Sequence, residues 1–224
     1  MEILDLLIIG AGPIGLNCAL EAKKNNLTYL IVEKGTIVNS LYHYPLYMRF
    51  FSTAEKLEIA EIPFITTAPK PGRQDALEYY QGIARQKDLS INLYEKVLNV
   101  RKNEEIFEVE TSKSRYYEKN VIISTGFYDH PNTMNIPGEN LEKVKHYYTE
   151  PYPFAQQKIV VVGSSNSAVD AALETYRKGA EVTMIIRHSE ISKSVKYWVK
   201  PDIENRISEG SINAHFNADL TEIK

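Results

Sequence analysis

Residues 4–34 read LDLLIIGAGPIGLNCALEAKKNNLTYLIVEK, in which two short apolar runs flank a glycine-rich turn and a helical stretch. The first run, residues 4–9, is typical of a strand buried on both faces of a parallel sheet. Residues 13–25 carry apolar side chains at helical spacing, and residues 28–34 form a second strand pattern. The stretch therefore predicts a βαβ unit and an α/β fold.

The turn of this unit reads GAGPIG, a complete GxGxxG between a strand and a helix. In such a loop Gly10 permits the tight turn, Gly12 lets the backbone approach a pyrophosphate, and Gly15 lets the helix and strand pack closely. Glu33 follows Gly10 by 23 residues, where an acid accepts hydrogen bonds from a ribose hydroxyl. The alternative is a glycine-rich turn without a ligand, with Glu33 merely exposed.

A second unit of the same kind starts later, so the chain holds an imperfect internal repeat. Its first strand is predicted at residues 158–163, its helix at about 166–178 and its second strand at 181–187. Gly179 is expected to cap the end of the helix.

The second loop reads GSSNSA and lacks two of the usual glycines. Gly163 keeps the turn, Ala168 is an accepted substitute at the packing position, and Ser165 stands where the middle glycine would be. Arg187 follows Gly163 by 24 residues, and a guanidinium there pairs with a 2′-phosphate, with His188 assisting. The alternative is a βαβ unit without a ligand, with Arg187 solvated.

Two dinucleotide loops in one chain predict two cofactors. The loop followed by an acid suits FAD, and the loop followed by arginine suits NADPH. Hydride would pass from the nicotinamide to the flavin, with the protein supplying position and electrostatics.

The rest of the chain shows less regular patterns. Residues 38–71 predict loop and short helix, and residues 74–87 predict a helix. Alternating runs predict a small antiparallel meander at about 90–124. Turn residues at 130–140 mark a boundary region.

Composition excludes several classes of protein. The 224 residues carry a formal net charge of −3, which provides no basic surface for nucleic acid or a membrane. No apolar run is long enough to span a bilayer, and we see no signal peptide. The single cysteine, Cys18, allows no intrachain disulfide and indicates a cytoplasmic protein. The five scattered histidines make no metal-ligand spacing, so no metal site is predicted.

Several stretches together resemble the YpdA-type flavoproteins, which are thioredoxin-reductase-like bacillithiol disulfide reductases. The resemblance covers essentially the whole chain and rests on GAGPIG with VEKG, FFSTAEKLEI, ISTGFYDHPN with IPGE, GSSNSAVDAALE with GAEVT, and SVKYWVKPDIENRI. The glycine loops occur in many flavoproteins, whereas FFSTAEKLEI and VKYWVKPDIEN are more specific.

The resemblance implies an α/β protein with two nested Rossmann-like dinucleotide-binding domains. It implies an FAD-binding domain over residues 1–150 and an NADPH-binding domain over 151–224. The implied FAD contacts are Gly10, Gly12, Pro13, Gly15, Glu33, Lys34, Thr125 and Gly126, with Ser52 near the isoalloxazine. The implied NADPH contacts are Gly163, Ser164, Ser165, Asn166, Ser167, Ala168, Arg187 and His188. Lys196 and Lys200 either add positive charge near NADPH or are solvated.

The chain departs from the family pattern in two places. Family members often carry a cysteine inside the first glycine loop, where this chain has Ile14, and Cys18 is expected to be a buried, inert thiol. Such flavoproteins also return to the FAD domain through a C-terminal segment with a Gly-Asp. This chain stops at NADLTEIK, in what the pattern predicts as a strand of the second domain. We therefore expect the NADPH-binding domain to be truncated and the chain to be C-terminally incomplete.

These features predict an NADPH-dependent flavoprotein that reduces an external acceptor, with a low-molecular-weight disulfide such as bacillithiol disulfide as the leading one. No catalytic residue is assigned, and the absence of a CxxC excludes a dithiol relay within the chain. The alternatives are an NADPH-dependent flavin monooxygenase and a noncatalytic nucleotide-binding or redox-sensing module. Flavoproteins of the resembled type are often dimers, and the sequence leaves a homodimer open.

Overall fold

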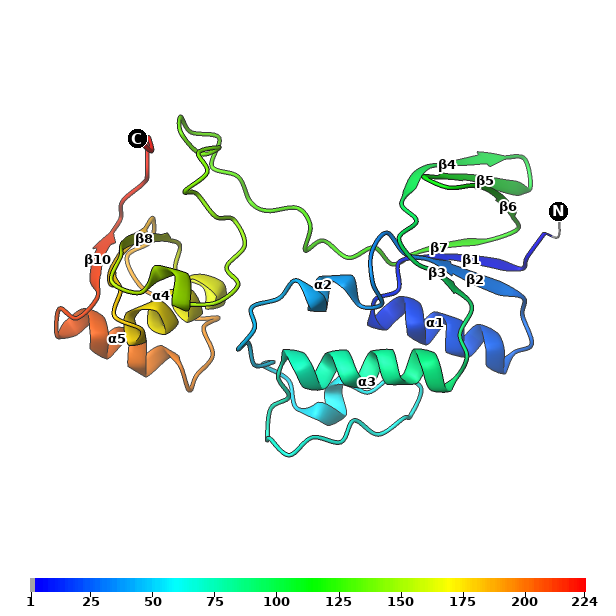
Figure 1. The fold of residues 1–224 in the computed structure, drawn as a ribbon, viewed down its shortest axis with the longest axis horizontal. Helices are drawn as coiled ribbons and strands as arrows, with labels where there is room; N and C mark the ends of the chain where they lie inside the picture. The colour runs from blue at the N-terminus through cyan, green and yellow to red at the C-terminus, as the bar shows by residue number, and fades with distance from the viewer. Residues whose placement is uncertain (1–2) are drawn as a thin grey trace. The chain divides into compact units, whose positions relative to one another are not determined.

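The computed structural model describes residues 3–224 and divides into two compact units, Met1–His130 and Pro131–Lys224 (Figure 1). The division lies at the start of the turn-rich segment 130–140. The domain boundary at 150/151 stays a prediction. Each unit is a mixed α/β structure with its own parallel sheet, as predicted.

The first unit is built on a four-stranded parallel sheet in the order β3-β2-β1-β7. Its strands are β1 (Leu6–Ile9), β2 (Tyr29–Val32), β3 (Ile91–Asn92) and β7 (Val121–Ile123). All four residues of β1 are buried, which confirms the prediction of a strand covered on both faces.

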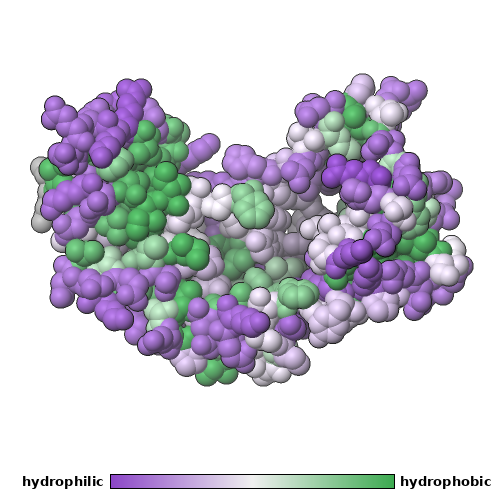
Figure 2. All heavy atoms as spheres, turned by 180° about the vertical axis from the view of Figure 1, so that it is seen from behind, coloured by the Kyte–Doolittle hydropathy of each residue, from purple (hydrophilic) through white to green (hydrophobic). Residues whose placement is uncertain are grey.

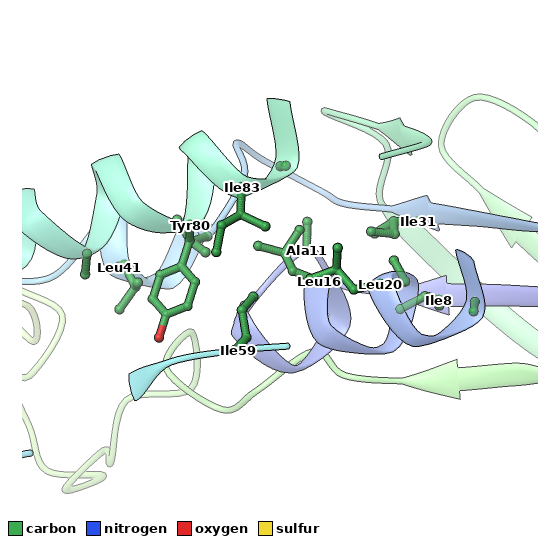
Figure 3. Close-up of a cluster of buried hydrophobic side chains, with 14 of the residues drawn as sticks. Ile8, Ala11, Leu16, Leu20, Ile31, Leu41, Ile59, Tyr80 and Ile83 are labelled. Atoms are coloured by element: carbon green, nitrogen blue, oxygen red, sulfur yellow. The ribbon is translucent and has the colours of Figure 1, made fainter. Parts of the chain in front are cut away.

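Helices cover one face of this sheet. They are α1 (Pro13–Lys24) and α3 (Arg73–Gln86), close to the predicted bounds. Ile8 and Ile31 of the sheet pack with Leu16 of α1 and with Tyr80 and Ile83 of α3 in the main core (Figure 3). The intervening segment forms the short elements α2 (Asn39–Tyr42) and η1 (Ala54–Leu57), as predicted for residues 38–71.

An antiparallel meander covers the other face, where Val109 packs against Leu7, Ile9 and Val32. Its strands are β4 (Val97–Asn103), β5 (Ile106–Thr111) and β6 (Arg115–Glu118). The predicted meander at about 90–124 was too long at both ends, because β3 and β7 pair in parallel with β2 and β1. Short apolar runs look alike in either kind of sheet, and only the strand partner distinguishes them.

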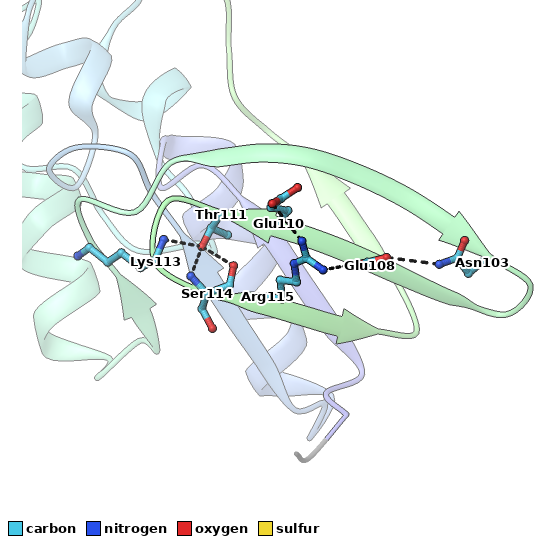
Figure 4. A network of polar contacts seen from close by, with 7 residues as sticks. All are labelled: Asn103, Glu108, Glu110, Thr111, Lys113, Ser114 and Arg115. Atoms are coloured by element: carbon cyan, nitrogen blue, oxygen red, sulfur yellow. Dashed lines mark hydrogen bonds and ion pairs between the residues drawn. The ribbon is translucent and has the colours of Figure 1, made fainter.

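Polar contacts hold the β5–β6 turn in shape (Figure 4). The Thr111 hydroxyl accepts the N–H groups of Lys113 and Ser114 at 3.2 and 2.8 Å. Arg115 pairs across the strands with Glu108 and Glu110, both at 3.3 Å. The turn is therefore an ordered part of the meander.

The second unit has a three-stranded parallel sheet in the order β10-β9-β8. Its elements are η2 (Tyr152–Phe154), β8 (Lys158–Val162), α4 (Asn166–Arg177), β9 (Glu181–Ile186), α5 (Lys200–Ser208) and β10 (Asn213–Phe216). The second βαβ unit is thus confirmed, and Gly179 follows α4 with φ +87°, as expected for a helix-ending glycine.

The C-terminal residues differ from the prediction of a strand. The last strand, β10, ends at Phe216, and residues 217–224 form no strand. There the Ile223 N–H donates to the Pro137 carbonyl at 2.9 Å. At the start of this segment the Ala218 N–H donates to the Ile186 carbonyl at 3.1 Å, so the segment contacts both β9 and the turn at Pro137 without forming a strand.

Hydrophobic side chains remain on the surface (Figure 2). Ile123 lies on the edge strand β7, and Val160 and Val162 lie on the edge strand β8; all three are exposed. Within residues 3–224, no helix is both long enough and apolar enough to cross a membrane.

Asp5 ties β1 to its neighbours and leads to a pH prediction. Its carboxylate accepts hydrogen bonds from Lys119 Nζ at 2.9 Å and from the Thr28 hydroxyl at 2.8 Å. These bonds, the Lys119 bond foremost, lower the pKa of Asp5 to about 2.

We expect the free energy of unfolding of Asp5→Asn to fall below that of the original chain at neutral pH. Because the pKa of Asp5 is lowered on folding, its contribution is present above the ordinary value of 3.8 and is lost as the pH falls towards about 2. Urea unfolding of both proteins between pH 7 and pH 2 would measure the difference. A difference that stays constant over this range would contradict the assignment.

Candidate functional site

The first glycine loop is held at the carboxyl end of β1 by the packing of its glycines. Gly10 has φ +106°, and a Cβ there would lie 2.7 Å from the Ser124 carbonyl oxygen. A Cβ on Gly15 would lie 1.9 Å from the Gly10 carbonyl oxygen. Nothing lies within 4 Å of a Cβ placed on Gly12. Gly10 and Gly15 are therefore required by the fold, whereas Gly12 borders open space that a ligand can fill.

The N-terminus of α1 opens beside this space. Gly12 is its N-cap, Pro13 is its first residue, and no side chain among the described residues caps it. The amides of the first turn and the helix dipole therefore remain available to an anion. Ile14, the second helical residue, is 66% exposed. This cradle fits a pyrophosphate.

Glu33 has a role that the sequence pattern did not show. It is only 6% exposed, and its two carboxylate oxygens accept the N–H groups of Ala11 and Gly35 at 2.8 and 2.9 Å. The carboxylate thus links the loops after β1 and β2. Each carboxylate oxygen can accept a second bond, so the predicted bond to a ribose hydroxyl remains compatible with this geometry.

The segment after β7 lies against the first loop. The Ser124 hydroxyl contacts the carbonyl oxygens of Ile9 and Gly10 at 2.9 and 3.0 Å. Gly126, with φ +66°, follows Thr125 at the carboxyl edge of the sheet, where ligands bind in such folds. The structure therefore brings two of the predicted FAD segments together.

Lys34 and Ser52 were also predicted to contact FAD. The Lys34 ammonium pairs with the carboxylate of Asp129, which follows the Thr125–Gly126 segment by three residues. Ser52 precedes η1, and its place near the isoalloxazine stays a prediction. Cys18 is half-buried on α1 and packs against the core, close to the buried thiol expected.

The second loop reproduces the first with a serine in place of the middle glycine. Gly163 has φ +120°, and its added Cβ would lie 3.3 Å from the Ala168 Cβ. Ser165 is the N-cap of α4 without a side-chain bond to the helix. Ser164 is buried. The first amides of α4 and the Ser165 hydroxyl can therefore face an anion.

Arg187 and His188 follow directly on β9 and are exposed. The carboxyl ends of β8 and β9 meet at one edge of the sheet, so both residues share an edge with the second loop. The His188 carbonyl accepts the Asn217 N–H at 3.1 Å, which supports the start of this loop. An exposed guanidinium there fits a 2′-phosphate.

Lys196 contradicts the prediction of a solvated lysine, and its place near NADPH stays a prediction. It is only 7% exposed, and its ammonium bonds to the Asp170 carboxylate of α4 at 2.7 Å. It is therefore neither solvated nor a free positive charge. Lys200 is partly exposed and lies 3.7 Å from Glu204. Sequence alone gave no sign of the Lys196–Asp170 pair, which joins residues 26 positions apart.

Comparison with known proteins assigns the fold to a family. The model for pyridine nucleotide-disulphide oxidoreductases matches residues 7–224. The chain belongs to this family. Membership confirms the predicted oxidoreductase class and its cofactor pair, FAD and NADPH, which the two cradles fit. Within residues 3–224, no group of three potential metal ligands is found.

Individual relatives agree with the resemblance seen in the sequence. Bacilliredoxin reductase Bdr of Bacillus subtilis is 44% identical over 97% of this chain and 67% of its own length. Solved bacillithiol disulfide reductases Bdr (YpdA) from Bacillus cereus and Staphylococcus aureus are 44% and 40% identical, each with a TM-score of 0.97. This chain, aligned over its whole length, covers 70% and 69% of them. These similarities confirm the predicted YpdA-type resemblance and favour a disulfide reductase over a monooxygenase.

Proposed function

We propose that this chain carries the FAD and NADPH sites of a YpdA-type reductase that acts on a low-molecular-weight disulfide such as bacillithiol disulfide. The observation that carries the proposal is the pair of helix N-termini without side-chain caps, each behind a glycine turn. The first loop is followed by buried Glu33 and the second by exposed Arg187.

The residues of the first unit would hold FAD. The N–H groups of Gly12 and Ile14 would bind its pyrophosphate, since Pro13 between them has no N–H. Glu33 would accept a hydrogen bond from a ribose hydroxyl, and Thr125–Gly126 would lie along the cofactor. The flavin, when bound, supplies the chemistry of accepting hydride from a nicotinamide.

The residues of the second unit would hold NADPH. The first turn of α4 would bind the pyrophosphate, with Ser165 donating its hydroxyl to a phosphate oxygen. Arg187 would pair with the 2′-phosphate and His188 would donate to it, which would make NADPH preferred over NADH.

The acceptor is proposed from the relatives and from the chain's own cysteine content. Two solved relatives are named bacillithiol disulfide reductases, and the Bacillus subtilis relative is named a bacilliredoxin reductase. One NADPH and one proton would convert one disulfide into two thiols and NADP+. Since Cys18 is the one cysteine, no dithiol in this chain can relay the electrons. The disulfide would meet the flavin directly or use a thiol of a partner protein.

We also propose the finer architecture on this basis. The two units would be nested Rossmann-like domains, and further chain would cover the exposed apolar edges at β7 and β8. The protein would work in the cytoplasm, where a lone cysteine stays reduced, and a homodimer is the proposed assembly.

An anaerobic titration tests the cofactor assignment. We expect bound flavin to lose its absorbance with one equivalent of NADPH and to require far more NADH. Arg187→Ala should lower the preference for NADPH by about tenfold to a hundredfold, because a charge-assisted phosphate contact is lost. Arg177→Ala is the matched control, since Arg177 lies in the last turn of α4, at the end away from the second loop, and pairs with Asp202 of α5.

Other outcomes of this titration separate the alternatives. Equal loss of flavin absorbance with NADPH and NADH would reject Arg187 as the residue that recognises the 2′-phosphate. Nucleotide binding without flavin reduction would favour a noncatalytic module. An oxygenated product after reoxidation in air would favour a monooxygenase.

A further inference from the structure

A segment that no dinucleotide motif predicts crosses the N-terminus of α4. Residues 192–196 follow β9 and are tied to the second loop at one end and to α4 at the other. The Ser192 N–H donates to the Ser164 carbonyl at 3.1 Å. The Lys196 ammonium donates to Asp170 on the second turn of α4 at 2.7 Å. We call this stretch the crossing segment.

Asn166, the first residue of α4, joins the crossing segment with both ends of its amide. Its Oδ1 accepts the Lys196 N–H at 2.9 Å, and its Nδ2 donates to the Ser194 carbonyl at 2.9 Å. The side-chain amide thus bonds to one backbone N–H and one backbone carbonyl of the crossing segment. The Nδ2 group has a second N–H, so the predicted contact of Asn166 with NADPH stays compatible with this geometry and stays a prediction.

Lys196 and Asp170 form the second attachment. The ion pair is mostly buried, so removing one partner leaves the other desolvated and unpaired. Glu174, one turn after Asp170, also faces this pair; burial raises its pKa and the Tyr148 hydroxyl lowers it. The ammonium of Lys196 therefore faces carboxylates on α4.

From these contacts we infer that Asn166 and Asp170 are positioning residues for NADPH selection. The inference rests on the proposed function. The loop that carries Arg187 and His188 lies between β9 and the crossing segment, so it is anchored by the sheet at one end and by Asn166 and Asp170 at the other. Anchoring both ends limits the conformations of the loop and pre-organises its contact with a 2′-phosphate.

Two substitutions test the inference through nucleotide affinity. Calorimetry of the 224-residue chain with NADP+ and with NAD+ gives the ratio of the two dissociation constants. Asn166→Ala should weaken NADP+ binding by about tenfold, because the two hydrogen bonds that hold the crossing segment are lost, and NAD+ binding much less. Asn205→Ala, on the exposed side of α5, is the matched control and should change neither.

Asp170→Asn separates positioning from simple electrostatics. Removing this carboxylate leaves the Lys196 charge less neutralised, so electrostatics alone predicts tighter NADP+ binding. A loosened crossing segment predicts weaker NADP+ binding and a smaller preference over NAD+. Tighter binding by Asp170→Asn, or equal losses of NADP+ and NAD+ in Asn166→Ala, would overturn the inference.

Amide hydrogen exchange provides a readout that does not need a nucleotide. We expect the Lys196 and Ser192 amides to be protected in the original chain and to exchange at least about tenfold faster in Asn166→Ala. Unprotected amides in the original chain would overturn the inference. Failure of the original chain to bind either nucleotide would instead reject the proposed function. The attachment of the crossing segment to α4 would then be tested by amide hydrogen exchange alone.

Discussion

The Gly15→Ala variant is expected to lose about 3 kcal/mol or more of its free energy of unfolding, the upper range for forcing an atom into packed structure. The added Cβ would lie 1.9 Å from the Gly10 carbonyl oxygen and 2.8 Å from the Ser124 hydroxyl. Gly10 lies in the loop after β1, where its N–H donates to the Val32 carbonyl at 2.9 Å and the Ser124 hydroxyl lies 3.0 Å from its carbonyl oxygen, so the carbonyl cannot withdraw without breaking these contacts. Urea unfolding followed by circular dichroism would measure the loss.

Gly12→Ala is the matched control for this prediction. Gly12 has φ −75°, which any residue adopts, and nothing lies within 4 Å of its added Cβ. We expect its stability to change by no more than about 0.5 kcal/mol, the usual range for substitutions without new contacts. Its affinity for FAD should fall, because the new methyl group occupies the space proposed for the pyrophosphate. Equal stability of the two variants would contradict the packing argument.

The Ile14→Cys variant is expected to gain a reactive thiol. Ile14 is 66% exposed and is the second residue of α1, where the helix dipole lowers the pKa of a thiol. We expect this thiol to react with a small aromatic disulfide at pH 7 at least about tenfold faster than Cys18, because it is both more ionised and more accessible. Stopped-flow absorbance would give both rates.

Glu21→Cys separates exposure from the helix effect. Glu21 is exposed on the same helix but lies near its C-terminal end, where the dipole does not favour a thiolate. A rate for Ile14→Cys no higher than that for Glu21→Cys would contradict the prediction. The resembled family often carries cysteine at this position. The variant therefore also measures the thiol reactivity that is lost when isoleucine stands there.

Most of the first site could be predicted because its signals are local. The turn at Gly10, the packing at Gly15 and the acid at position 33 follow from spacing along a single βαβ unit. The sequence could not show that Glu33 binds two backbone N–H groups, Ala11 and Gly35, because those bonds depend on how closely two loops approach. The predicted contact residue was therefore also a structural one.

The second site shows the same division between local and distant information. Arg187 was placed at a strand end by its distance from Gly163, and the structure puts it there. Lys196 was expected either to be solvated or to add positive charge near NADPH, and the structure excludes the first of these because Lys196 is buried against Asp170. A lysine has no sequence signal for burial, because burial depends on a partner that another element supplies.

The sequence by itself determined the two βαβ units, their glycine turns and the charge that follows each one, since periodicity and short spacings record local backbone requirements. Tertiary structure alone decided that residues 91–92 and 121–123 join the parallel sheet, that residues 217–224 form no strand, and that Asn166 is bound to the crossing segment. The physical reason is that these features are choices between partners far apart in the chain, and a choice of partner is settled by packing and hydrogen bonding in the folded state.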